Sequence, residues 1–88
     1  LTPMRFIEGA PRFAVEVRSE SDYGPSAEQE IEAKREEYFQ AGTLVVWDVD
    51  TLAQEIRSWT NGATAPVVFR PGDTANAEPA VPGWTIGV

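Results

Sequence analysis

The stretch from residue 13 to residue 49, FAVEVRSESDYGPSAEQEIEAKREEYFQAGTLVVWDV, decides the fold of this chain. Residues 13–18 alternate between two faces, which predicts a strand. Residues 26–41 have the periodicity of a helix, and residues 43–49 are apolar on both faces, as in a central strand covered on each side. A strand, a helix and a second strand in this order predict a crossover unit of an α/β domain.

Both ends of the predicted helix have residues that are typical of helix termini. Ser26, followed by Gln29 three residues later, fits a capping box, which makes Ser26 the predicted N-cap. Gly42 is expected to end the helix at the C′ position, where a glycine adopts positive φ without a Cβ penalty.

The C-terminal half predicts a β-hairpin. Residues 54–59 and 67–70 form its strands, with Asn61-Gly62 in the connection. Pro71-Gly72-Asp73 predicts a turn that ends the second strand, and the following stretch to Gly83 is expected to be a loop. Residues 84–88 are expected to form a short edge strand. The whole chain, residues 1–88, is predicted to be one small domain with a mixed sheet.

Composition excludes several classes of chemistry. The 88 residues include no cysteine and no histidine, which removes disulfides, thiol catalysis, the usual zinc ligands and the usual general base. Carboxylates, hydroxyls and amines remain, and these suit oxygen-ligated hard cations. The net charge of −7 argues against tight non-specific binding of nucleic acid.

The sequence also bears on location and completeness. No stretch is long and apolar enough for a membrane span, and residues 1–8 lack a secretory signal pattern, so we expect a cytoplasmic protein without membrane contact. Because Leu1 is followed so soon by what looks like a core strand, we expect that the N-terminus of a larger domain is missing.

Lys34 stands where a lysine is unusual. It lies in the middle of the narrow helical stripe that is predicted to face the sheet, made of Ala27, Ile31, Lys34, Tyr38 and Ala41. Glutamates and glutamines occupy the opposite face, including Glu28 and Glu32. Glu16 stands on the more polar face of the first strand. A helix that packs back on this strand can bring Glu16 and Lys34 together. Metal-assisted phosphodiester hydrolysis requires a carboxylate and an ammonium in this arrangement. The carboxylate holds Mg²⁺, and the lysine stabilises the charge that develops or orients the attacking water.

Simpler interpretations stay open at this stage. Glu16 could form an ion pair with Arg18 on the same strand face, and Lys34 could extend past Tyr38 to solvent. Asp48 and Asp50 could hold a second metal, although acids at strand exits more often make turns and solvent contacts. Asp22 is interpreted as a turn residue. Tryptophans can stack on bases, but Trp47 at least is expected in the core.

The chain resembles a known family in an ordered series of segments. Residues 13–19, the spacing Lys34-x-x-x-Tyr38-x-x-x-Gly42, residues 45–50, residues 69–73 and residues 81–84 are similar to the Uma-type family of bacterial restriction endonucleases, which share the PD-(D/E)XK nuclease core. The resemblance implies a restriction-endonuclease-like α/β fold with one main helix between the Glu16 and Val45 strands and a C-terminal hairpin. It also implies a DNA substrate and Mg²⁺ or Mn²⁺ as the cofactor.

The resemblance further implies roles for individual residues. Glu16 would be the metal-binding glutamate, Val17 would lend its backbone carbonyl to the metal, and Lys34 would take the lysine role, because Arg18 stands in the usual lysine position. Two departures matter. Arg12 follows Pro11 where the family often has aspartate, and no aspartate precedes Asp22 to complete the metal site. Glu8 lies too close to the strand to replace it.

We therefore interpret the chain as a metal-dependent DNA endonuclease domain, with two rivals. One is a degenerate, non-catalytic remnant that acts as a protein-interaction module through an exposed sheet edge. The other is a structural domain in which Glu16, Arg18 and Lys34 form a buried ion network. An exposed edge beside residues 13–18 would also favour a homodimer.

Overall fold

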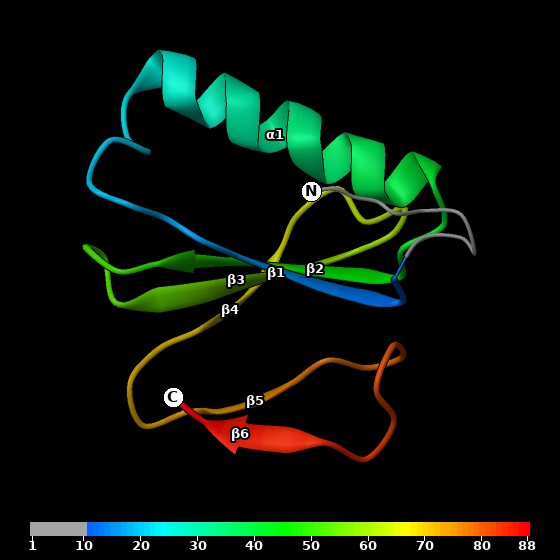
Figure 1. Ribbon diagram of the computed structural model, residues 1–88. Coiled ribbons are helices and arrows are strands. Elements are labelled where there is room, and N and C mark those ends of the chain that lie inside the picture. Colours follow the sequence, from blue (N-terminus) through cyan, green and yellow to red (C-terminus); the bar gives the residue numbers. More distant parts are fainter. Residues whose placement is uncertain (1–10) are drawn as a thin grey trace.

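A computed structural model describes residues 11–88. In chain order the elements are β1 (Phe13–Val17), α1 (Pro25–Gln40), β2 (Val45–Asp50), β3 (Glu55–Thr60), β4 (Val67–Phe69), β5 (Thr74–Asn76) and β6 (Thr85–Gly87). The first four strands form one sheet in the order β1-β2-β3-β4, in which β1 and β2 are parallel and the other pairs antiparallel. The predicted crossover unit and mixed α/β sheet are confirmed (Figure 1). The described residues contain no helix that is long and apolar enough to cross a membrane.

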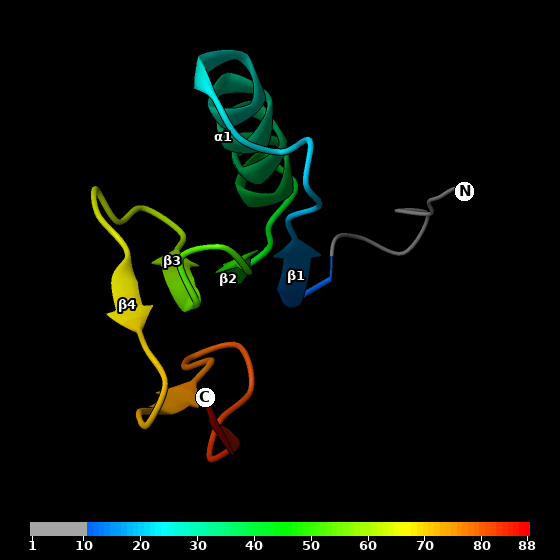
Figure 2. The same ribbon diagram turned by 90° about the vertical axis from the view of Figure 1, so that its left-hand side faces the viewer.

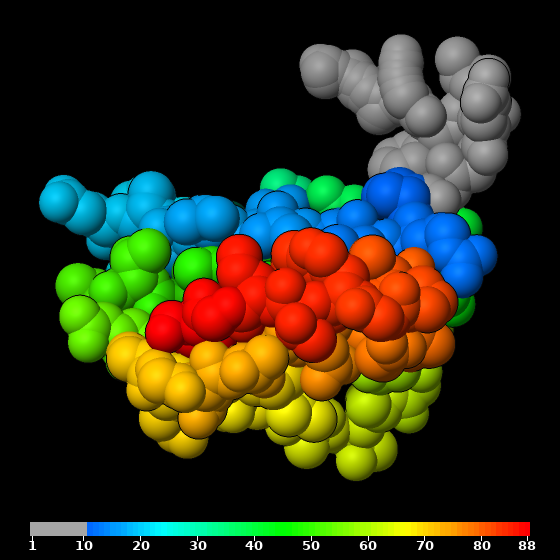
Figure 3. Space-filling model, turned by 90° about the horizontal axis from the view of Figure 1, so that it is seen from below, coloured from blue at the N-terminus to red at the C-terminus, as the bar shows by residue number. Residues whose placement is uncertain are grey.

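The sheet lies between two different layers. Helix α1 runs over one face, and the β5–β6 hairpin covers the other (Figure 2). Seen from the hairpin side, the orange to red C-terminal segment lies across the sheet beside the blue β1 (Figure 3). Strand β2 is buried between these layers, as its two apolar faces predict.

The apolar core lies on the hairpin side of the sheet. Val45 and Trp47 of β2 pack there with three small residues of the C-terminal segment, Ala75, Ala77 and Ala80. Trp47 is buried, as predicted, and its ring contacts two other aromatic rings. Phe13 meets it edge-on at 5.1 Å between ring centroids, and Trp84 lies 5.7 Å away. Such edge-to-face packing adds to the burial of the rings.

The start of α1 differs from the prediction, whereas its end agrees. Gly24, with φ of 98°, is the N-cap in place of Ser26, and no side chain caps the helix. Pro25 explains the shift, because its fixed φ suits the first helical position and its missing N–H needs no partner there. At the other end Gly42 has φ of 109°. Its N–H donates to the carbonyl of Phe39, and Thr43 N–H donates to that of Tyr38, which completes a Schellman motif.

Helix α1 has no buried residue. The sheet face beneath it is largely charged, since the parity of β1, β2 and β3 places Glu16, Asp48 and Arg57 side by side there. The helix face that was predicted to meet solvent also contacts the sheet side of the molecule, because Glu28 pairs with Arg18. The guanidinium of the neighbouring Arg35 lies 3.9 Å from the centroid of a sheet tryptophan, Trp59. Polar contacts rather than apolar burial therefore hold the helix in place.

The C-terminal half contains one strand that the sequence did not predict. The β3–β4 hairpin is found where expected, but β5 (Thr74–Asn76) lies within the predicted loop. Strand β6 pairs with β5 in a separate two-stranded sheet, so it is not an edge strand of the main sheet. The three residues of β5 are too few to show an alternating pattern.

Candidate functional site

Glu16 lies in β1 on the face toward α1, where two side chains of the helix reach it. The ammonium nitrogen of Lys34 lies 3.0 Å from Oε1, and the hydroxyl of Tyr38 donates to Oε2 at 3.0 Å. Lys34 and Tyr38 are four residues apart and thus neighbours on one helix face. The predicted meeting of Glu16 and Lys34 is found, and their catalytic roles stay predictions.

The Glu16–Lys34 pair lies at the rim of the helix–sheet interface. The Lys34 side chain is 57% exposed and that of Glu16 is 33% exposed. The hydrogen bond to Glu16 raises the pKa of Lys34, while partial burial opposes this effect, so the ammonium stays charged at neutral pH. Lys34 is therefore less inward than its place in the helical stripe suggested, because its long stem leads the ammonium toward water.

A cavity of about 220 Å³, lined by charged and apolar side chains, opens beside this pair. Its lining includes Glu16, Val17, Asp22, Glu30 and Lys34. The carboxylate of Glu16 and the carbonyl of Val17 are oxygen donors of the kind that Mg²⁺ and Mn²⁺ take, and the space admits water ligands. However, residues 11–88 hold no group of three or more acidic, histidine or cysteine side chains placed to hold a metal. The donors are thus of the kind that a hard cation takes, but they are too few to hold one tightly.

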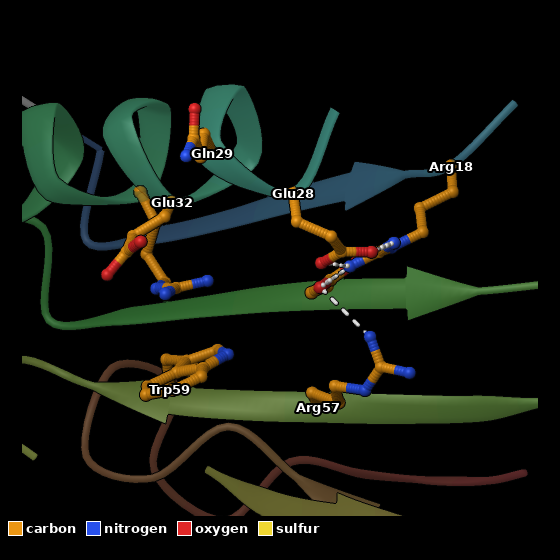
Figure 4. A pocket seen from close by; sticks show the side chains of 8 residues that line it. Arg18, Glu28, Gln29, Glu32, Arg57 and Trp59 are labelled. Atoms are coloured by element: carbon orange, nitrogen blue, oxygen red, sulfur yellow. Dashed lines mark hydrogen bonds and ion pairs between the residues drawn. The ribbon is translucent and has the colours of Figure 1, made fainter. Parts of the chain in front are cut away.

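Arg18 does not pair with Glu16, so that interpretation was wrong. The Arg18 guanidinium is buried and donates to both oxygens of Asp48, from Nε at 2.9 Å and from Nη2 at 2.8 Å. Its third nitrogen, Nη1, donates to the Glu28 carboxylate on the helix, and Nη2 donates to that carboxylate as well, as Figure 4 shows. Arg18 pairs with Asp48 rather than Glu16 because Asp48, on the neighbouring strand, can accept two hydrogen bonds from the guanidinium at once. The buried network predicted for Glu16, Arg18 and Lys34 is therefore two separate groups.

Asp48 and Asp50 are both buried, which corrects the expectation of solvent contact. Arg57 of β3 binds Asp50 at 2.6 Å and approaches Asp48 at 3.5 Å. Asp50 also accepts from the hydroxyl of Tyr23 and from the N–H groups of Leu52 and Ala53, so its predicted turn role is confirmed. Because ion pairs and turn contacts occupy these carboxylates, they are poor candidates for a second metal site.

Asp22 is a turn residue, as interpreted. Its carboxylate accepts from the backbone N–H of Ser19 at 2.7 Å and from the Ser19 hydroxyl at 2.8 Å. These hydrogen bonds lower the pKa of Asp22. The turn brings this carboxylate to the rim of the Glu16 cavity.

A second cavity, of about 320 Å³, lies between α1 and strands β2 and β3. Figure 4 shows how the side chains of the buried network point into it from the helix and the sheet. Gln29 and Trp59 contribute to its lining. The other lining residues are three arginines and three acids: Arg18, Arg35, Arg57, Glu28, Glu32 and Asp48. Three positive and three negative side chains give this lining no net formal charge.

The ion pairs predict a loss of stability in acid. The hydrogen bond from Arg18 lowers the pKa of Glu28. Burial opposes ionisation of Asp50, but the N–H of Ala53, the Tyr23 hydroxyl and Arg57 outweigh it, so its pKa is lowered as well. Groups with lowered pKa stabilise the fold above their ordinary pKa and lose this contribution as the pH falls. We expect stability to drop below pH 4.5, the ordinary pKa of a glutamate.

Urea denaturation from neutral to acid pH measures this effect. Glu28→Gln removes one of the titrating groups, so its stability should fall less steeply in acid than that of the parent. Glu37→Gln, a change of the same kind on the exposed side of the helix, should follow the parent curve. Equal slopes for all three proteins would contradict the role of Glu28.

The crossover of β1, α1 and β2 within a mixed sheet is consistent with a restriction-endonuclease-like α/β fold. A family model, Uma2, described as "Putative restriction endonuclease", matches residues 2–88, and the chain belongs to this family. Among curated proteins, none matches the sequence. The predicted family is thus confirmed, and its description points to a nuclease.

The sequence did not predict the contacts of Tyr38, Glu28 and Arg57, nor the pairing of Arg18 with Asp48. Tyr38 could have been found, because it shares the helical stripe of Lys34 and therefore the same approach to Glu16. Arg57 could not, since its contact with Asp48 depends on the register between β2 and β3. Glu8 lies outside the described residues.

Proposed function

We propose that this chain is a nuclease domain that hydrolyses DNA phosphodiester bonds with the help of Mg²⁺ or Mn²⁺. The observation that carries the proposal is the position of Glu16, which Lys34 and Tyr38 hold at the edge of a cavity. The description of the family supports it independently.

Each residue has a distinct part in this proposal. Glu16 and the carbonyl of Val17 would hold the cation, which when bound polarises a phosphate oxygen and lowers the pKa of water. Lys34 keeps its positive charge and reaches the same carboxylate, so it can stabilise the negative charge that develops on a phosphate brought there. Arg18 takes no part in the chemistry, because Asp48 and Glu28 engage its guanidinium.

A second candidate is a non-catalytic interaction module, and two observations favour it. Residues 11–88 lack a cluster of three possible metal ligands. Strand β1 is an edge strand within the described sheet, and it exposes Val15 and Val17. An exposed edge of this kind can pair with a strand of another protein or of a second copy.

Metal binding separates the two candidates. We expect Mn²⁺ to bind in the millimolar range, because hard cations are held weakly where few carboxylates contribute. Paramagnetic broadening of amide signals should concentrate around Glu16 during a Mn²⁺ titration, and Glu16→Gln should abolish it. Glu37→Gln makes the same change in charge on the exposed helix face and should bind like the parent. If both variants retain the same broadening, Glu16 is not a ligand and the interaction module gains support.

A further inference from the structure

The two carboxylate oxygens of Glu16 are used by different donors. Oε1 accepts from the ammonium of Lys34, and Oε2 accepts from the hydroxyl of Tyr38. A cation that binds Glu16 must therefore either replace one of these contacts or share an oxygen with it. Which contact yields depends on how firmly each donor is held.

Tyr38 is the firmer of the two donors. Its own backbone carbonyl accepts from Thr43 N–H at 3.0 Å in the Schellman motif, which fixes the residue at the end of α1 where the chain enters β2. Its side chain is half-buried and has only two χ angles, whereas the Lys34 side chain is flexible and 57% exposed.

We propose that Tyr38 is the positioning residue of the site: it fixes Oε2 of Glu16, so that Oε1 is the oxygen that exchanges between the Lys34 ammonium and a divalent cation. This inference rests on the proposed function. Carboxylates that bind metals are commonly held by a hydrogen bond of this kind, and the loss of such a partner weakens metal binding about 10- to 100-fold.

The proposal predicts that only one of the two donors supports Mn²⁺ binding. Tyr38→Phe removes only the hydroxyl and should weaken Mn²⁺ binding about 10-fold or more. Lys34→Met removes the ammonium that competes for Oε1 and should leave Mn²⁺ binding unchanged or make it tighter. A purely structural role for Tyr38 would lower thermal stability without changing the affinity of the folded protein for Mn²⁺.

The chain contains a matched control. Tyr23, the other of its two tyrosines, also donates its hydroxyl to a carboxylate, but to Asp50 rather than Glu16. Tyr23→Phe therefore deletes an equivalent hydrogen bond away from the cavity. Mn²⁺ titrations followed by paramagnetic broadening would compare the parent, Tyr38→Phe, Tyr23→Phe, Lys34→Met and Glu16→Gln, each confirmed as folded by its amide spectrum.

Each outcome of these titrations supports or overturns the positioning role of Tyr38. Weaker Mn²⁺ binding in Tyr38→Phe, with Tyr23→Phe binding like the parent and Lys34→Met binding at least as tightly as the parent, supports the positioning role. Equal binding by Tyr38→Phe and the parent, or equal weakening in Tyr23→Phe, overturns that role and leaves Glu16 as the ligand. A parent that binds no Mn²⁺, or a Glu16→Gln variant that binds like the parent, overturns the proposed metal site and the inference with it.

Discussion

Replacing Arg18 with methionine is expected to destabilise the domain by about 3–5 kcal/mol. The side chains of Arg18 and Asp48 are only 3% and 5% exposed, so removal of the guanidinium leaves a buried carboxylate. Its remaining partner, Arg57, lies 3.5 Å away and is already engaged by Asp50 and Glu55. Because small domains are stable by only about 5–15 kcal/mol, a loss of this size would remove about a third or more of the stability of a domain in the lower half of that range.

Urea denaturation at neutral pH measures the change, and Lys34→Met is its control. The Glu16–Lys34 ion pair is solvated, and exposed pairs contribute about 0–1 kcal/mol, so Lys34→Met should be nearly neutral or slightly stabilising. A double variant, Arg18→Met with Asp48→Leu, should recover much of the lost stability, because it leaves no unpaired buried charge. A fully stable Arg18→Met protein would show that the buried network is not what joins the helix to the sheet.

Local patterns in the sequence predict the elements that form the site, but they do not predict how the buried charges pair. Alternation placed Glu16 on the helix side of β1, and the helical period placed Lys34 above it. The partner of Arg18 could not be found in this way. Asp48 is 30 positions away, and its choice over Glu16 follows from the parallel register of β1 and β2. Register depends on the whole sheet, which a single strand does not encode.

The contacts of helix α1 show a second reason why the structure differs from the sequence-based prediction. The stripe of Lys34 was expected to pack on the sheet and the glutamate face to meet solvent. In the structure both contribute contacts, because the sheet face below carries charges that need partners. Glu28, at the start of the helix, therefore turns inward to Arg18. A hydrophobic pattern predicts where apolar side chains lie, but a helix that docks through ion pairs has only a weak pattern of this kind.

The residues of the site are expected to have separable effects on DNA cleavage. With few metal ligands among the described residues, the chain should cleave supercoiled DNA slowly, at a rate that rises with Mn²⁺ concentration. Glu16→Gln should abolish the metal-dependent cleavage. Lys34→Ala should retain Mn²⁺ binding but slow the cleavage about 10²-fold or more, because it removes one charge-stabilising group from a preorganised site.

Single-turnover measurements with protein in excess of DNA keep binding of the substrate from hiding the chemical step. Under these conditions the Lys34 effect should remain when Mn²⁺ is saturating, whereas a defect in metal binding would shrink as Mn²⁺ is raised. Glu37→Gln controls for the general effect of lost negative charge on the approach of DNA, and it should cleave like the parent. If Glu16→Gln cleaves as fast as the parent, the active site lies elsewhere. If instead the parent shows no cleavage while Glu16 still binds Mn²⁺, the described residues hold a cation without catalysing hydrolysis, as the non-catalytic alternative requires.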